Sequence, residues 1–226
     1  NPSTAYVARV ASAFNNNGAG VRGDLRAMFR AILLDEEARS AATLSQPLFG
    51  KLREPMLRLV QLGRTFGLTS AAGSWKIGDL SNPATQLGQS PLRSPSVFNF
   101  FRPGYVPPSS ALASAQSVAP EFQLVSESSV GGYLNYMQNT IQKGISSDLK
   151  AAYASELALV TDAAALVGRL NLLLCAGQLS SATQTLIIDA LNATPVTTTS
   201  TDTVKLNRVA AAVLLVMASA EYLAQK

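Results

Sequence analysis

The stretch from Leu87 to Pro108 constrains the fold more than any other part of the chain. Its sequence, LGQSPLRSPSVFNFFRPGYVPP, holds five of the eleven prolines, and proline lacks the backbone N–H that helix interiors and sheet ladders require. Four aromatic residues fall within eight positions of this stretch: Phe98, Phe100, Phe101 and Tyr105. Each aromatic ring buries about 150–250 Å² when it packs. We therefore expect an irregular loop whose rings lie between helices on either side.

Ser94-Pro95 suggests one short interruption of this irregular segment. Serine is a preferred N-cap and proline is favoured at the first helical position. The pair predicts one short helical turn over Pro95–Phe101, which Arg102-Pro103-Gly104 then ends.

The segment before the loop has the spacing of helices. Two apolar stripes with intervals of three and four precede residue 40, and a row of arginines accompanies the second. The first stripe comprises Tyr6, Val7, Val10, Ala11 and Phe14; the second comprises Leu25, Met28, Phe29, Ile32 and Leu33, with Arg22, Arg26 and Arg30 beside it. Together they predict a helical hairpin. A third helix begins at Glu54-Pro55, with Met56, Leu59, Val60 and Gly63 facing inward and Arg58 and Arg64 facing out.

The segment after the loop also predicts helices. They begin at Ser126, Asp148, Thr161, Ser181 and Thr203. The last, Thr203–Leu223, is apolar on all sides at its centre and should lie deep in the core. No alternation of period two is present, so we predict an all-α fold, an irregular bundle of about seven or eight helices with the aromatic- and proline-rich loop packed between them. We expect one helical domain over residues 1–226, with residues 68–125 as its irregular central segment.

The composition excludes several chemistries. The chain has no histidine and a single cysteine, Cys175, which excludes Ser-His and Cys-His nucleophile pairs, most zinc sites and an internal disulfide. We predict no catalytic residue, no metal and no cofactor, and a non-enzymatic role is favoured. The longest apolar run, Val209–Ala218, is ten residues, short of the roughly 20 that a membrane span needs.

The positive charge is concentrated in the first part of the chain. Residues 1–102 carry twelve Lys and Arg against six Asp and Glu, whereas residues 103–226 carry six against eight. A basic face suits an acidic partner or phosphate; the alternative is that these arginines lie on solvated helix faces or pair with carboxylates. Nucleic-acid binding is disfavoured because the basic residues alternate with apolar helix stripes.

One cluster of residues around the irregular segment is a candidate binding or structural site. It comprises Arg53, Glu54, Arg93, Phe98, Phe101, Arg102, Tyr105 and Glu121. Two nearby glutamates suit acid/base work if one pKa is raised, although Glu54 also fits the first turn of a helix, where the dipole favours it. The arginines suit either anion binding or tethering of loop carbonyls and glutamates.

Several phrases resemble one known family. They are KLREP at 51–55, GQSPLRSPSVFNFFRPGY at 88–105, APEF at 119–122, AILLDEEAR at 31–39 and ASAEY at 218–222. The chain is similar over its whole length to the bacterial family catalogued as domain of unknown function 1800. The resemblance implies export to the periplasm or beyond the cell, frequent encoding beside a sulfatase-like exported protein, and no established activity. Family members are longer, with a helical region upstream, so we expect this chain to be the C-terminal part of a longer precursor.

Two functions follow as hypotheses. The first is a non-enzymatic helical interaction or assembly module of an exported bacterial protein, whose partner is another protein or the upstream region of the same precursor. The alternative is part of an enzyme or binding protein for an anionic or carbohydrate polymer, with Arg53, Glu54, Arg93 and Arg102 lining a cleft.

Overall fold

The all-α prediction is confirmed by the structure, a computed structural model that describes residues 1–146 and 148–226. Seven helices of the described residues have ten or more residues: α1 (Thr4–Asn15), α2 (Leu25–Leu34), α4 (Pro55–Thr65), α6 (Glu127–Lys143), α8 (Ala163–Cys175), α9 (Ser181–Asn192) and α10 (Asp202–Ala218). The shorter elements are α3 (Glu36–Arg39), α5 (Ala111–Ser114), α7 (Ala154–Leu157), α11 (Ala220–Leu223), the 3₁₀ helices η1 (Ala41–Ser45) and η2 (Pro120–Leu124), and the two-residue strands β1 (Lys51–Leu52), β2 (Thr69–Ser70), β3 (Leu149–Lys150) and β4 (Ala224–Gln225). No helix of the described residues is long and apolar enough to cross a membrane.

The chain divides into two compact units. Unit 1 comprises Asn1–Lys51, Val106–Val118 and Lys226, and unit 2 comprises Leu52–Tyr105 and Ala119–Gln225. The sequence predicts a single domain over residues 1–226, and that assignment stays a prediction.

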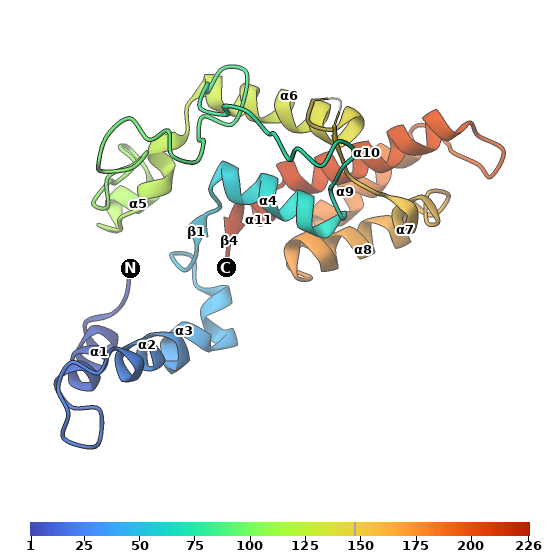
Figure 1. The fold of residues 1–226 in the computed structure, drawn as a ribbon. Coiled ribbons are helices and arrows are strands. Elements are labelled where there is room, and N and C mark those ends of the chain that lie inside the picture. Colours follow the sequence, from blue (N-terminus) through green and yellow to red (C-terminus); the bar gives the residue numbers. More distant parts are fainter. Residues whose placement is uncertain (147) are drawn as a thin grey trace. The chain divides into compact units, whose positions relative to one another are not determined.

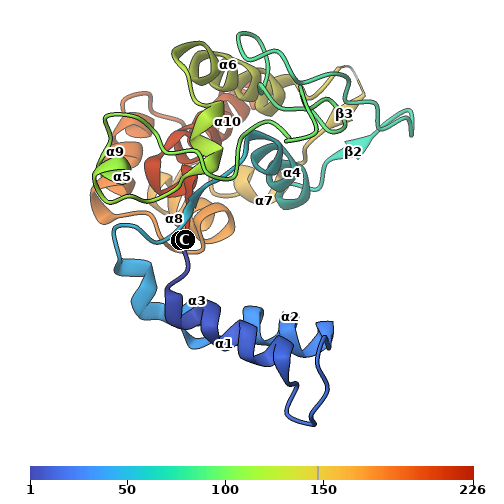
Figure 2. The same cartoon turned by 90° about the vertical axis from the view of Figure 1, so that its left-hand side faces the viewer.

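Unit 2 holds the hydrophobic core, and α10 lies at its centre. Figures 1 and 2 show α10 between α6 and α8, and it also contacts α7 and α9. Its buried residues point in several directions around the helix: Arg208, Val209, Ala210, Ala212, Val213, Val216 and Met217. The prediction that this helix lies deep in the core is confirmed. It ends earlier than predicted, because Ser219 is extended (φ −69°, ψ 150°) and its hydroxyl caps α11.

The first half of the irregular segment is packed into unit 2. Leu80 and Leu87 are each 1% exposed, and Gln89 and Ser90 are also buried. The backbone reaches α6 at Gly132, where a Cβ atom would lie 2.2 Å from the carbonyl oxygen of Pro83. A side chain at that position therefore conflicts with the observed path of the segment. At the start of the segment, β2 pairs with β3 in antiparallel register, Thr69 opposite Lys150 and Ser70 opposite Leu149.

The second half of the segment differs from the prediction. Leu92 and Val97 are fully exposed and Phe98 is 71% exposed, whereas Phe100, Phe101 and Tyr105 are half-buried. The predicted packing is therefore wrong for Phe98. The prediction of a short helix over Pro95–Phe101 is also wrong. No helix forms there, and the chain makes one non-helical turn over Ser96–Asn99, closed by the hydrogen bond from Asn99 N to Ser96 O (3.2 Å). Asn99 adopts the left-handed backbone conformation (φ 70°), which does not continue a right-handed helix.

Replacing Gly132 tests the close approach of the segment to α6. We expect Gly132→Ala to destabilise the protein by about 1–3 kcal/mol, because the new methyl group has to displace the backbone at Pro83 and Ala84. Gly131→Ala is the matched control, since a Cβ there meets nothing within 4 Å and alanine favours the helix by up to about 1 kcal/mol. Denaturant unfolding of both variants checks this, and equal stabilities would contradict the packing.

Candidate functional site

Helices α1 and α2 form a hairpin because local residues end the first helix, form the turn and begin the second. The Ser3 hydroxyl caps α1 and the Asp24 carboxylate caps α2, each by accepting a backbone N–H three residues on. In the turn between them, Asn16 Oδ1 accepts hydrogen bonds from two glycine N–H groups, those of Gly18 and Gly20, at 2.9 Å. These bonds fix the turn before any contact with the rest of the chain.

Side chains then fasten the two helices to each other. Tyr6 Oη donates to the Ile32 carbonyl at 2.8 Å. Arg9 forms a bidentate ion pair with Asp35, at 2.6 and 2.8 Å, which holds the pKa of that carboxyl below its usual range. The hairpin is therefore held largely by polar contacts along one side.

One face of α2 has no partner within unit 1. Leu25, Phe29 and Leu33 follow one another at intervals of four and are 56%, 55% and 66% exposed, so they form a continuous row. Met28 and Ile32, from the same predicted stripe, are half-buried instead. The apolar stripe predicted on α2 is thus divided. Met28 and Ile32 pack within the hairpin, whereas Leu25, Phe29 and Leu33 are exposed.

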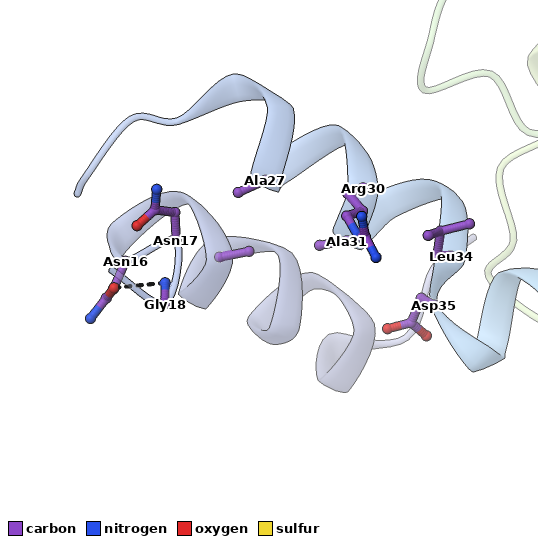
Figure 3. A pocket seen from close by; sticks show the side chains of 9 residues that line it. Asn16, Asn17, Gly18, Ala27, Arg30, Ala31, Leu34 and Asp35 are labelled. Atoms are coloured by element: carbon purple, nitrogen blue, oxygen red, sulfur yellow. Dashed lines mark hydrogen bonds between the residues drawn. The ribbon is translucent and has the colours of Figure 1, made fainter. Parts of the chain in front are cut away.

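A row of positive charge runs beside this apolar row. Arg26 and Arg30 each follow an apolar row residue by one position, and among the described residues neither forms an ion pair. Arg30 lines a shallow groove between α1 and α2 together with Ala13, Ala27 and Ala31, and Figure 3 shows Arg30 beside Ala31. We call the apolar row (Leu25, Phe29, Leu33) and the arginine row (Arg26, Arg30) together the hairpin face.

The eight residues predicted as one site have separate environments. Arg53 donates to Gln61 Oε1, Glu54 accepts from Gln89 Nε2, and Arg93 pairs with Asp79 at 3.1 Å. Hence Arg53 and Arg93 both have partners that the sequence did not indicate.

The remaining five lie later in the chain. Phe98 and Arg102 are exposed, while Phe101, Tyr105 and Glu121 are half-buried. Among the described residues, one hydrogen bond joins two members of the eight, from Tyr105 N to Arg102 O at 3.1 Å. A shared site for all eight stays a prediction.

A different cluster, which the sequence did not indicate, lies inside unit 2. The guanidinium of Arg53 lies 4.5 Å from the ring centre of Tyr222, and that of Arg58 lies 4.6 Å from the ring centre of Tyr133. Arg58 is 7% exposed and Tyr222 is fully buried. We call these four residues the arginine–tyrosine cluster.

The prediction that Arg58 faces outward is therefore wrong, whereas Arg64 is exposed as predicted. A signal was present: Pro55, Arg58, Leu59 and Leu62 fall on one helix face, and all four are buried. The sequence predicts a surface position for Arg58 because charged groups are seldom buried without a partner.

Burial sets the proton affinities in this cluster. It raises the pKa of Tyr133 to about 12 and raises that of Tyr222 further, while it lowers the pKa of Arg58. Both tyrosines are thus neutral at physiological pH and do not balance the charge of the arginines. The hydroxyl of Tyr133 donates to the Met217 carbonyl at 3.1 Å, whereas that of Tyr222 has no hydrogen-bond partner.

Cys175 and the acidic side chains of the described residues were candidates for thiolate chemistry and metal binding. Burial raises the pKa of the Cys175 thiol to about 11, which opposes thiolate chemistry. No group of three or more Asp, Glu, Cys or His side chains in the described part of the chain is placed to hold a metal ion.

Comparison with known proteins gives one family. The family model described as "Protein of unknown function (DUF1800)" matches residues 1–224. No curated protein and no solved structure matches the chain.

The two tyrosines of the cluster provide a matched pair of substitutions. In a chloride buffer, Tyr133→Phe should cost about 1–3 kcal/mol because the buried Met217 carbonyl loses its donor. Tyr222→Phe should leave the stability unchanged or raise it slightly, since the removed hydroxyl has no partner. Chemical denaturation measures both. A larger loss for Tyr222→Phe than for Tyr133→Phe would contradict the hydrogen bonding described above.

The cysteine gives a test of burial. With its pKa raised to about 11, Cys175 carries on the order of a hundredfold less thiolate at neutral pH than a free cysteine with a pKa near 8.5. We expect a thiol reagent to react with the native protein at least that much more slowly than with the protein in guanidinium chloride. Similar rates in both conditions would show that this end of α8 is open to solvent.

Proposed function

This chain belongs to the DUF1800 family of proteins of unknown function, and we propose that it is a non-enzymatic helical interaction and assembly module of an exported bacterial protein. The proposed location, in the periplasm or outside the cell, is supported by the resemblance of the chain's sequence motifs to that family. The interaction role is supported by the hairpin face.

The apolar row of the hairpin face is the observation that carries the proposal. Three large side chains, each more than half exposed, lie in a line on one helix. Single exposed apolar residues are ordinary, but a continuous patch bordered by polar residues is typical of a protein interaction site. Amphipathic helices commonly bind such a surface with their own apolar stripe.

The charges of the face select the partner. In the described part of the chain Arg26 and Arg30 form no ion pair, while Asp24 caps α2 and Asp35 is engaged by Arg9. A second copy of the hairpin in parallel contact would bring arginine rows together, and like charges facing each other disfavour such a pair. We therefore assign the face to an amphipathic helix with an apolar stripe flanked by Asp or Glu.

No observation favours the polymer-binding alternative over this role. Arg53, Glu54 and Arg93 each bond to a different partner. The proposal therefore rests on unit 1 and not on a cleft lined by those residues.

A designed peptide pair tests the proposal. One fluorescent helix carries leucines at intervals of three and four with flanking glutamates, and the other has lysines in place of the glutamates. We expect the acidic peptide to bind and the basic one to bind at least tenfold more weakly, because a tenfold change corresponds to about 1.4 kcal/mol, within reach of two charge pairs. Fluorescence anisotropy measures both affinities.

Two substitutions locate the binding. Leu33→Ser should weaken binding of the acidic peptide about tenfold or more, and Leu186→Ser should leave it unchanged, since Leu186 is a comparably exposed leucine (71%) on α9, outside the face. Equal losses in both variants, or no binding by either peptide, would count against the interaction role. Self-association abolished by Leu33→Ser would instead assign the face to a second copy.

A further inference from the structure

Among the described residues, unit 2 holds two neighbouring arginines that no carboxylate balances, whereas Arg208, also buried without an ion pair, donates to the Leu191 and Thr194 carbonyls. Arg58 is 7% exposed and Arg53 is half-buried, and among the described residues neither takes part in an ion pair. Buried charges in proteins are normally paired, because removing an isolated charge from water is costly. Arg53 and Arg58, which lie within six residues of each other in the sequence, are both exceptions to that rule.

The protein supplies only part of what these guanidinium groups need. Arg58 Nε donates to the Arg53 carbonyl at 2.7 Å and Arg53 Nη1 donates to Gln61. The rings of Tyr133 and Tyr222 add cation–π contacts, each worth about 0.5–2 kcal/mol. All of these partners are neutral.

Two donors remain without a partner. Arg53 Nε and Tyr222 Oη are both buried, and among the described residues neither has a partner of good hydrogen-bond geometry. Buried polar groups almost always have partners, and an exception calls for an explanation such as an ion. Both orphan atoms belong to residues in cation–π contact with each other, so they lie in one place and not at two unrelated defects.

The neighbouring acids do not supply the missing charge. Glu54 follows Arg53 in sequence but accepts from Gln89. Glu221 precedes Tyr222 but accepts from Ser180 N at 3.3 Å and from Thr183 Oγ1 at 2.7 Å. Both carboxylates bind other groups, which leaves two positive charges and two free donors together.

We propose that Arg53, Arg58 and Tyr222 form a binding site for a small oxyanion of the sulfate or phosphate type. Guanidinium groups match the oxygens of such anions in geometry and charge, and a neutral phenol adds one more donor. The burial of Arg58 and Tyr222 restricts the ligand to a free ion. The anion ties α4 to α11, since Arg58 lies in α4 and Tyr222 in α11, and it thereby stabilises the fold.

The test is thermal or chemical unfolding of the full chain with increasing sodium sulfate or phosphate, at constant ionic strength set with sodium chloride. We expect the stability to stay constant below the anion concentration that half-saturates the site and to rise above it, where each tenfold increase in anion raises the folded-to-unfolded ratio about tenfold. A general salt effect, in contrast, has no such threshold set by the cluster and is shared by all variants.

Arg58→Met and Arg64→Met form the matched pair, because both arginines lie on α4 and Arg64 is exposed. We expect Arg58→Met to lose the anion dependence and Arg64→Met to keep it. If Arg58→Met does not fold, Tyr222→Phe serves instead, because it removes one donor that has no partner. We expect the half-saturating anion concentration of this variant to rise about tenfold, since the anion loses one hydrogen bond to a charged group.

Four results would overturn the proposal. Equal dependence on sulfate, phosphate and chloride, or an equal response in Arg64→Met and Arg58→Met, would show that no anion binds at the cluster. An unchanged half-saturating concentration in Tyr222→Phe would remove the phenol from the site. Equal stabilisation by glycerol phosphate would overturn the assignment of a free ion and give the site to the terminal phosphate of a larger molecule.

Discussion

The burial of α10 is the constraint on which unit 2 depends. A helix with buried residues in several directions is stable in water only if neighbours cover it on all those sides, and α6, α7, α8 and α9 do so. Their positions in turn determine where other segments run. The irregular segment packs Leu80 and Leu87 into this core and crosses α6 at a glycine. Beyond Ser90, residues 91–99 find no such apolar surface and are exposed, whereas Phe100, Phe101 and Tyr105 are half-buried.

The same core explains why two arginines are inside it. Arg58 shares a face of α4 with Pro55, Leu59 and Leu62, so burying those three carries the guanidinium inward with them. The ring of Tyr133 receives it there. A helix face is buried as a whole, and one charged member does not keep it in solvent when the apolar members outweigh it. The arrangement leaves a charge for which an external anion is the natural complement.

Unit 1 shows the opposite balance. Its hairpin is held by caps, by Tyr6 and by the pair of Arg9 with Asp35, and neither helix has a fully buried residue. Polar contacts of this kind fix a geometry but bury little apolar surface. The apolar row on α2 is therefore left free, and a hairpin that is rigid but incompletely covered is well suited to hold a partner helix.

The sequence by itself determined most of the long helices and the irregular segment, because these depend on residues close together in the chain; the helix predicted from Asp148 was wrong, since β3 lies there and α7 begins only at Ala154. The 3–4 spacing, the Asp24 and Ser126 caps and the run of prolines act over one or two turns. It also excluded histidine and disulfide chemistry by composition. Only the tertiary structure decided that Arg58 is inside, that Phe98 is outside and that the stripe on α2 is split between covered and bare edges. Burial depends on which surfaces meet, and segments far apart in sequence determine that.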